Sequence, residues 1–406
     1  MFKPIYTSTG AMLGFSSMLD VISNNVSNMN TPGFKRSEVA FKDVFYNAGF
    51  AGHGYSGQRS IWVGSGNDVG SGQRVFTNGE MSPTGRDLDA AISGNGFFVL
   101  RKNGELFYTR AGQFELSDEG YLIDSTTGGR VMAYNGSALD DISIAGLRTS
   151  APKATSRIAF EDNLSSSPSN TTPRTVTVQI HDPVGDLHTL NITFTKNPMA
   201  MGGWLVEVAD SNGQPVGGGP FEIRFRPDGT PEAGFNSFDV NMRFGTAPPM
   251  TVTFFFGEPG SMLGATSYAT GSTSTLRVAQ VDGHALGSLS ETTFDASGKL
   301  TLTYSNGQTV TGPQLALADF FDRQSLQPVG DNLFRAPANL SPRFAIASSG
   351  GMGSVVAKNI ELSNVDLTAE FSDIIINQRG FQASSQLMNV ANQLLDTLIA
   401  DTSGGR

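Results

Sequence analysis

The two ends of the chain carry apolar residues at helical spacing, unlike the long stretch between them. Near the N-terminus, apolar positions recur at steps of three and four residues after one gap of seven. This heptad pattern is typical of a helix that packs along a partner helix. The positions are Ile5, Met12, Phe15, Leu19, Ile22, Val26 and Met29, with Ser8 inside the gap. Pro32 and Gly33 should end the helix, because proline cannot continue it and glycine tolerates the turn.

The C-terminus repeats this pattern more loosely. Asp366 can cap the start of a helix, and Glu370 in the first turn favours the helix dipole. The apolar positions are Leu367, Phe371, Ile374, Phe381, Leu387, Ala391, Leu394 and Leu398. Gly380 lies in the loose middle of the stripe, at a cost of about 1 kcal/mol in a helix interior. We expect the two end helices to pair as a coiled coil and to pack against copies of themselves, since exposing such stripes costs about 1.5–3 kcal/mol per large side chain.

Between the ends, apolar and polar residues alternate and tight-turn sequences recur. Phe97–Leu100 leads through Asn103 and Gly104 into Leu106–Tyr108, which is the pattern of a β-hairpin. Alternation also marks three later runs: Val176, Val178, Ile180; Leu190, Ile192, Phe194; Phe221, Ile223, Phe225. This pattern predicts antiparallel sandwich or barrel domains. The expected fold class is therefore mainly β with α-helical termini.

Glycine- and serine-rich stretches indicate where the chain passes from one domain to the next. Because both ends are expected to pair, each domain should be nested inside the one before. The expected divisions are a terminal helical assembly region (1–48 and 355–406), an extended linker (49–72), an inner β domain (73–148 and 276–354) and an outer inserted β domain (149–275).

Composition narrows the possible functions. A chain of 406 residues should form roughly two to four domains. The net charge of −10 repels phosphate backbones, which argues against nucleic-acid binding. Cysteine is absent, so a disulfide framework and a thiolate metal site are excluded. No run approaches the ~20 apolar residues that span a bilayer, and the N-terminus does not read as a cleavable secretion signal.

Several segments resemble the bacterial flagellar axial proteins, the family of rod, hook and hook-associated subunits. SNNVSNMNTPGFKR (23–36) resembles the N-terminal signature of that family, and SGNGFFVL (93–100) and YTRAGQFELSDEGYLID (108–124) are similar to its inner β domain. QPVGDNLF (327–334) and SNVDLTAEFSDIIINQRGFQASSQ (363–386) resemble the C-terminal signature. The N-terminal signature positions are Asn24, Asn25, Asn28, Thr31, Pro32, Gly33 and Phe34.

This resemblance implies a structural subunit of a helical tubular polymer. Chain length and the insertion at 149–275 favour a subunit of the hook, the flexible universal joint that transmits motor torque, over a shorter distal rod subunit. The implied partners are copies of the chain, the other axial proteins (rod, hook cap and hook–filament junction) and the flagellar export apparatus. The implied location is the extracellular flagellum, reached by export without a cleaved signal peptide and without membrane insertion.

The sequence offers little for chemistry. His181 and His188 flank the segment Asp182–Asp186, where a polar hairpin turn explains them better than a metal site. Gly52–Gly57 matches GxGxxG but lacks the preceding strand and following helix that phosphate binding needs. We therefore expect no catalytic, cofactor-binding or metal site, and no enzyme. An alternative of another class is an extracellular ligand-binding protein or adhesin, which would show an exposed aromatic cluster; the chain has only Trp62 and Trp204.

Overall fold

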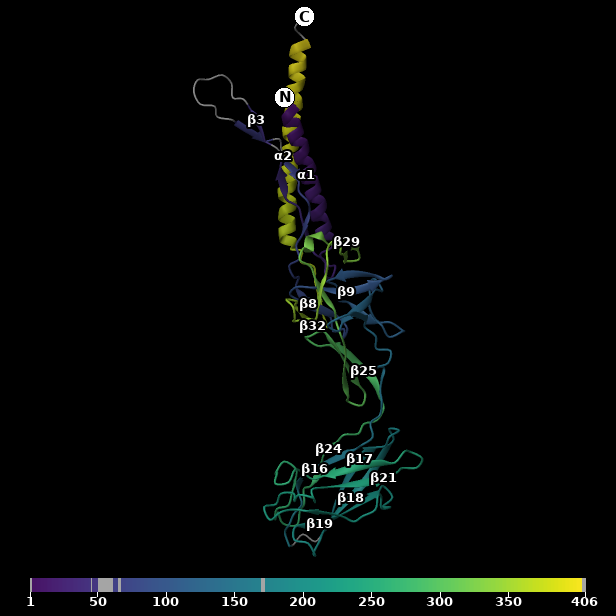
Figure 1. The fold of residues 1–406 in the computed structure, drawn as a ribbon. Helices are drawn as coiled ribbons and strands as arrows, with labels where there is room; N and C mark the ends of the chain where they lie inside the picture. The colour runs from purple at the N-terminus through teal and green to yellow at the C-terminus, as the bar shows by residue number, and fades with distance from the viewer. Residues whose placement is uncertain (1, 45, 50–60, 65–66, 169–171, 404–406) are drawn as a thin grey trace. The chain divides into compact units, whose positions relative to one another are not determined.

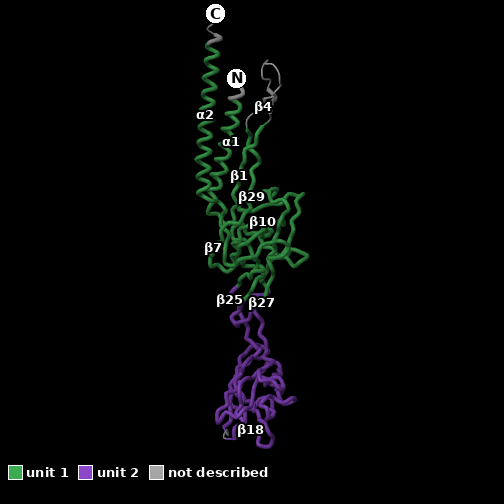
Figure 2. Tube along the Cα trace, turned by 90° about the vertical axis from the view of Figure 1, so that its left-hand side faces the viewer, with its two compact units in different colours: residues 1–145, 292–302, 311–406 green, residues 146–291, 303–310 purple. Residues whose placement is uncertain are grey.

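The computed structural model of the chain describes residues 2–44, 46–49, 61–64, 67–168 and 172–403. It contains two compact units (Figures 1 and 2). Unit 1 comprises Met1–Ala145, Thr292–Leu302 and Thr311–Arg406, and unit 2 comprises Gly146–Glu291 and Thr303–Val310. The predicted fold class is confirmed, because strands dominate both units and a helix forms each end of the chain.

The terminal helices α1 (Phe2–Ser27) and α2 (Leu367–Ser403) pack against each other in unit 1 (Figure 1). The predicted cap is confirmed: the Asp366 carboxylate accepts hydrogen bonds from the backbone amides of Thr368 (2.8 Å) and Ala369 (3.3 Å). The helices are antiparallel, since Asn25 contacts Glu370 whereas earlier residues of α1 lie beside later residues of α2. The 37 residues of α2 exceed the 26 of α1, and α2 extends past the start of α1.

An irregular antiparallel hairpin follows α1. Its successive pairs are β1 (Ser37–Glu38) with β6 (Gln73–Arg74), β2 (Phe41–Asp43) with β5 (Asn67–Val69), and β3 (Tyr46–Gly49) with β4 (Ile61–Gly64). The segment 49–72 was expected to be an extended linker. Its described residues instead include β4 and β5, which form the second half of this hairpin. The GxGxxG match lies within 50–60, outside the described residues. The hairpin also contacts α1 through β1 and β5, so α1 packs on two sides.

A ten-stranded sheet forms the centre of unit 1, with the order β11-β12-β13-β9-β10-β30-β29 and three further strands beside it. The strands are β9 (Phe97–Lys102), β10 (Glu105–Thr109), β11 (Phe114–Leu116), β12 (Leu122–Asp124), β13 (Arg130–Tyr134), β14 (Leu139–Asp141), β28 (Leu317–Asp319), β29 (Gln327–Gly330), β30 (Leu333–Arg335) and β31 (Arg343–Ala345). The predicted β9–β10 hairpin is confirmed, with Asn103 (φ 54°) and Gly104 (φ 83°) in its turn. The hydrophobic core beside this sheet includes Phe97, Tyr108 and Phe320.

Two short ladders join the N-terminal and C-terminal parts of the chain. Strand β7 (Met81–Pro83) pairs with β33 (Asn359–Glu361), and β8 (Ala90–Ser93) pairs with β32 (Ser354–Ala357). These ladders lie between the helices and the ten-stranded sheet in the sequence. They fix where the chain leaves the sheet and enters α2.

Unit 2 contains two sheets that share one core. A four-stranded sheet has the order β17 (Arg174–His181), β18 (Leu187–Lys196), β19 (Gly203–Asp210), β20 (Phe221–Arg224). A five-stranded sheet consists of β21 (Ser237–Met242), β22 (Met250–Phe255), β16 (Arg157–Asn163), β23 (Ala265–Thr266) and β24 (Arg277–Val281). Inward residues of both sheets, among them Phe194, Trp204 and Phe254, form one cluster, which is the arrangement of a sandwich. The predicted alternation is confirmed in β17, where Val176 and Val178 are buried.

The expected boundary of the outer domain at residue 275 differs from the observed one. Strand β24 pairs antiparallel with β16, so the chain remains in unit 2 until Glu291. A further four-stranded sheet consists of β15 (Thr149–Ser150), β25 (Gly287–Phe294), β26 (Lys299–Tyr304) and β27 (Thr309–Gln314). Neither helix in the described part of the chain is long and apolar enough to cross a membrane.

Candidate assembly interface

On α1, the predicted stripe faces inward. Ile22 is 6% exposed, and Ser8, in the gap of the stripe, is 5% exposed. The other predicted positions are half-buried: Ile5, Met12, Phe15, Leu19 and Val26 on α1, and Met29 two residues after its end. This face of α1 is therefore largely used inside the chain, against α2 and the hairpin.

On α2, the residues that are buried are polar. Glu370, Asn377 and Ser384, spaced by seven, are 2%, 3% and 7% exposed. The predicted positions Leu367, Ile374 and Ala391 are half-buried. The remaining predicted positions are exposed: Phe371 (54%), Phe381 (40%), Leu387 (62%), Leu394 (62%) and Leu398 (43%). The structure thus leaves most of the C-terminal stripe outside the contact with α1.

An apolar strip lies along this open side of α2, interrupted between Ile376 and Leu387. Ile376, Leu387, Val390 and Leu394 are each at least half exposed. At 3.6 residues per turn they fall within about 60° of one another, and about 80–140° from the buried Asn377. We call these four residues the open α2 stripe. Ile376 and Val390 were not among the predicted positions, because they do not continue the spacing that begins at Leu367.

Gly380 proves to be a packing device. A Cβ atom at this position would lie 2.4 Å from the Cζ atom of Phe15, so the glycine lets the aromatic ring rest directly on the backbone of α2. The ring also contacts Phe41 of the hairpin edge-on, with 5.1 Å between ring centroids. The position that looked like a weak point of the helix is therefore where the helices approach closely.

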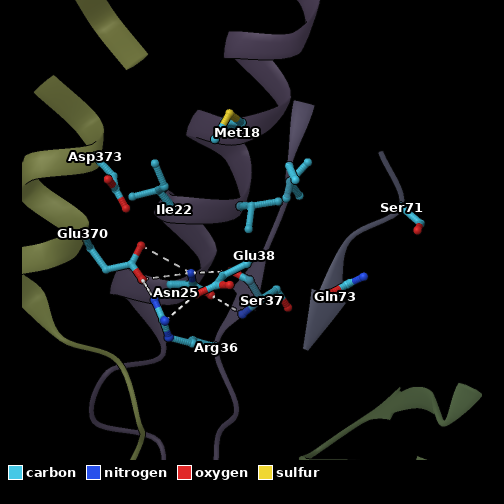
Figure 3. A pocket seen from close by; sticks show the side chains of 13 residues that line it. Met18, Ile22, Asn25, Arg36, Ser37, Glu38, Ser71, Gln73, Glu370 and Asp373 are labelled. Carbon is cyan, nitrogen blue, oxygen red and sulfur yellow. Dashed lines mark hydrogen bonds and ion pairs between the residues drawn. The ribbon is translucent and has the colours of Figure 1, made fainter. Parts of the chain in front are cut away.

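A polar cluster joins the C-terminal end of α1 to the start of α2, beside a cleft of about 290 Å³ (Figure 3). The Asn25 side-chain amide donates to the Glu370 carboxylate (3.1 Å) and to the Ser37 carbonyl (2.9 Å). Its oxygen accepts from the Ser37 backbone amide (2.9 Å). Arg36 lies 3.9 Å from the same carboxylate. Signature residue Asn25 thereby ties the helices to the hairpin, and burial raises the pKa of Glu370.

The pairing of the helices should depend on pH through Glu370. A carboxyl with a raised pKa in the folded state favours folding fully below its unfolded pKa of about 4.3, and this contribution is lost as pH rises through the folded value. We expect Glu370→Gln to protect α1 amides from hydrogen exchange more than wild type at pH 7 and equally at pH 4. Comparing both proteins at each pH cancels intrinsic exchange rates. The control is Asp396→Asn, which removes an exposed carboxylate 26 residues further along α2, and a Glu370→Gln protein less protected at pH 7 would contradict the argument.

The other signature residues close α1 and bind the segment before α2. Thr31 donates through its hydroxyl to the Asn28 side chain (3.2 Å), and the Pro32 carbonyl accepts from the Asn332 amide (2.8 Å). The Gly33 amide donates to the Glu361 carbonyl (2.7 Å) at a φ of 71°. The Asn24 carbonyl accepts hydrogen bonds from the backbone and side-chain amides of Asn28. The Phe34 carbonyl accepts one from the Asn364 backbone amide.

A buried ion cluster, which the sequence did not reveal, lies beneath these contacts. Lys35 Nζ is 2.5 Å from one Glu361 carboxylate oxygen, and Arg110 is 3.3 Å from the other. The three side chains are at most 1% exposed. Lys35 also donates to the Thr77 carbonyl (2.8 Å), and Arg110 donates to the Gly94 carbonyl (2.8 Å). Burial lowers the pKa of Lys35 despite the adjacent carboxylate.

The sequence gives no local signal for this cluster. Lys35 and Arg110 belong to the family-like segments 23–36 and 108–124, and Glu361 lies two residues before 363–386. Lys35 has Glu38 three residues after it, and Glu361 has Lys358 three residues before it, so the sequence offers each a nearer opposite charge.

His188, one of the two histidines considered as metal ligands, contacts a turn of unit 2. His188 Nε2 lies 3.0 Å from the Asp182 carboxylate and its ring stacks on Phe244, with 3.9 Å between centroids. The Asp182 carboxylate also accepts from the backbone amides of Val184 (3.0 Å) and Asp186 (2.9 Å). Within the described residues, no group of three or more acidic, histidine or cysteine side chains is placed to hold a metal ion.

Three family models match the chain. They are the flagella basal body rod protein (residues 5–35), the flagellar hook protein FlgE/F/G D1 domain (91–165) and the flagellar basal body rod FlgEFG protein C-terminal region (356–401). A solved structure, the Helicobacter pylori flagellar hook protein FlgE2, matches 68% of this chain and 98% of its own, at 12% identity and a TM-score of 0.44.

Curated relatives match along nearly the whole length. The chain is 30% identical to the flagellar hook protein FlgE of Treponema pallidum, covering 98% of this chain and 99% of that protein. It is 31% identical to FlgE of Salmonella typhimurium, covering 94% and 95%. The flagellar basal-body rod protein FlgG of Bacillus subtilis is 23% identical, covering 98% of each chain. Matched at both ends and across the β units between them, the chain belongs to the flagellar hook protein family.

Proposed function

We propose that the chain is the structural subunit of a bacterial flagellar hook, and that its copies polymerise into a flexible tube that transmits motor torque to the filament. The observation that carries the proposal is the open α2 stripe. Burying the exposed part of its four side chains would contribute roughly half of the ~1.5–3 kcal/mol that full burial of such a side chain contributes, and in the free chain this part faces water. A neighbouring copy with the same terminal helices offers the apolar surface that would cover them.

The two-unit organisation supports a tube that bends. The terminal helices, in unit 1, would hold copies tightly together. Unit 2 would contribute smaller and more polar contacts, which rearrange at low cost. The predicted residues of both terminal stripes and of the signature segment are the assembly surface in this proposal.

The finer functional assignments follow from this role. The neighbours of the chain would be the rod, the hook cap and the hook–filament junction, and its route outward would be the flagellar export apparatus, without a cleaved signal peptide. It would act in the extracellular part of the flagellum, as a structural protein without catalytic activity or cofactor. A distal rod subunit is the second candidate, favoured by the match to FlgG over 98% of the chain. Antibody labelling of purified hook–basal bodies separates the two candidates, because a hook subunit would be labelled along the hook and a rod subunit along the rod.

The assembly surface is tested by placing charge on the open α2 stripe. We expect Val390→Glu/Leu394→Glu to abolish tubes, seen by sedimentation and electron microscopy, because two carboxylates would have to be buried between copies. The monomer should keep its fold, since both residues are exposed. The control Gln378→Glu/Asn389→Asp adds the same charge at two exposed positions of α2 that lie at least about 100° from each residue of the stripe.

Two outcomes would count against the proposal. Normal tubes from the stripe variant would show that α2 does not assemble through this side. Failure of the wild-type chain to restore hooks in cells that lack their own hook protein, under conditions where a known FlgE does so, would overturn the hook function itself.

A further inference from the structure

Phe321 is the most exposed large apolar side chain in the described part of the protein. Its relative exposure is 106%, whereas its neighbour Phe320 is 4% exposed and packs edge-on against Tyr108, with 4.8 Å between ring centroids. One ring thus anchors the segment in the core of unit 1 and the next ring points into solvent. An isolated exposed aromatic of this kind gains most from entering a pocket on another molecule.

The segment that carries Phe321 is held in place on both sides. Asp322 caps the short helix η1 (Arg323–Ser325), accepting from the Gln324 amide at 3.0 Å. The Gln324 side chain in turn donates to the Arg74 carbonyl (2.7 Å) and accepts from the Arg74 amide (2.9 Å). Because the backbone of this segment is fixed, little backbone conformational entropy would be lost when Phe321 binds a partner.

Unit 1 also carries a pocket that suits an aromatic ring. It has a volume of about 340 Å³, and its walls include Tyr134, Phe344 and Ile346. Asn135 and Ser349 are among its polar lining residues. The lining has no charged side chain, so an apolar group can enter without displacing an ion.

Phe321 and the pocket lie at opposite ends of the β28–β31 ladder. Leu317 pairs with Ala345 at the pocket, and Asp319 pairs with Arg343 at the other end, two residues before Phe321. Strand β28 ends at Asp319, so the four residue steps from Leu317 to Phe321 place the Phe321 backbone at most about 13 Å from Leu317. The chain therefore presents a projecting ring and a receiving pocket at separate places on one unit.

We propose that Phe321 of one copy inserts into the Tyr134–Phe344–Ile346 pocket of a neighbouring copy. The inference rests on the proposed polymeric function and adds a specific contact to it. Two different patches that fit each other make a head-to-tail interface, which propagates into an open helical array when it does not close into a ring. The contact would lie between copies of unit 1, separate from the open α2 stripe.

The first test measures assembly. Phe321→Ala in the full chain should raise the critical concentration for tube formation about tenfold, equivalent to about 1.4 kcal/mol. Thermal unfolding of the monomer should be unchanged, because the side chain makes no buried contact within the chain. Phe321→Leu should assemble at a concentration close to wild type. A critical concentration unaffected by Phe321→Ala would overturn the inference.

The second test identifies the partner surface. A photo-reactive phenylalanine analogue at position 321, irradiated in assembled tubes, should form adducts between copies at Tyr134–Gly136 or Phe344–Ser349. The same analogue at Leu263, an exposed residue of unit 2, should give none at these peptides. Adducts only at other sites would refute the pocket as partner. Both tests use tubes formed by the wild-type chain or its variants, whatever the role of those tubes in the cell. If the wild-type chain formed no tubes, that result would count against the proposed function instead.

Discussion

Replacing Glu361 by alanine is expected to lower the free energy of unfolding of unit 1 by about 3–5 kcal/mol, because two buried cations lose the carboxylate that pairs with them. Lys35 and Arg110 are at most 1% exposed and cannot turn to water without opening the structure. The Gly79 amide, which donates to the same carboxylate at 2.8 Å, would also lose its partner. The cluster joins the segment after α1, the ten-stranded sheet and the segment before α2.

The measurement is hydrogen exchange of peptides from β7 and β33, which report unit 1 alone. A global denaturation curve would mix both units and is not a two-state signal. The control is Glu105→Ala, which removes an exposed ion pair with Arg335 and should cost no more than about 1 kcal/mol. Restoring part of the lost protection by adding Lys35→Met would identify the unpaired charge as the cause. Equal protection in the Glu361 and Glu105 variants would show that the cluster contributes little.

Local patterns predicted the elements of this fold well. The apolar spacing of α1 and the cap at Asp366 depend only on neighbouring residues, and so does the Asn103–Gly104 turn. Each is read directly from the sequence because helices and hairpins have fixed periods. The pairing of the two end helices was also predictable, since the residues between them offered no helical partner for either stripe.

The surface that α2 turns toward α1 could not be read from the sequence. A stripe such as Leu387 to Leu398 looks the same whether its partner is α1 or another copy. Only the fold shows that Glu370 and Asn377 occupy the contact and leave the apolar side open. A sequence pattern identifies a face that must be covered, but it does not identify which molecule covers it.

Pairings across long sequence distances were missed for a related reason. Strand β24 pairs with β16, which lies more than a hundred residues earlier. Arg277–Val281 shows no clean alternation that would have marked it as a strand. The charges of Lys35 and Glu361 meet across 326 residues. Nothing local marks either pairing, so the domain boundary and the buried cluster both required the structure.

Gly380→Leu is expected to weaken the α1–α2 contact by about 3 kcal/mol, at the upper end of the overpacking range. Helix propensity alone predicts the opposite sign, since leucine is favoured over glycine by nearly 1 kcal/mol. The reason is the Phe15 ring, which lies where the new side chain must go and is held from behind by Phe41. Protection of α1 amides from hydrogen exchange measures the change.

A compensating substitution decides whether Phe15 is the cause. Phe15→Ala alone should also weaken the pair, by leaving space over the glycine, whereas Phe15→Ala together with Gly380→Leu exchanges a large and a small side chain and should recover much of the loss. Gln378→Leu, at an exposed position of the same helix far from both Gly380 and the open α2 stripe, is the control and should leave α1 protection unchanged. Additive losses in the double variant would mean that Gly380 acts elsewhere than against Phe15. Recovery would instead establish that the glycine is selected by the close approach of the two helices, against its own helix propensity.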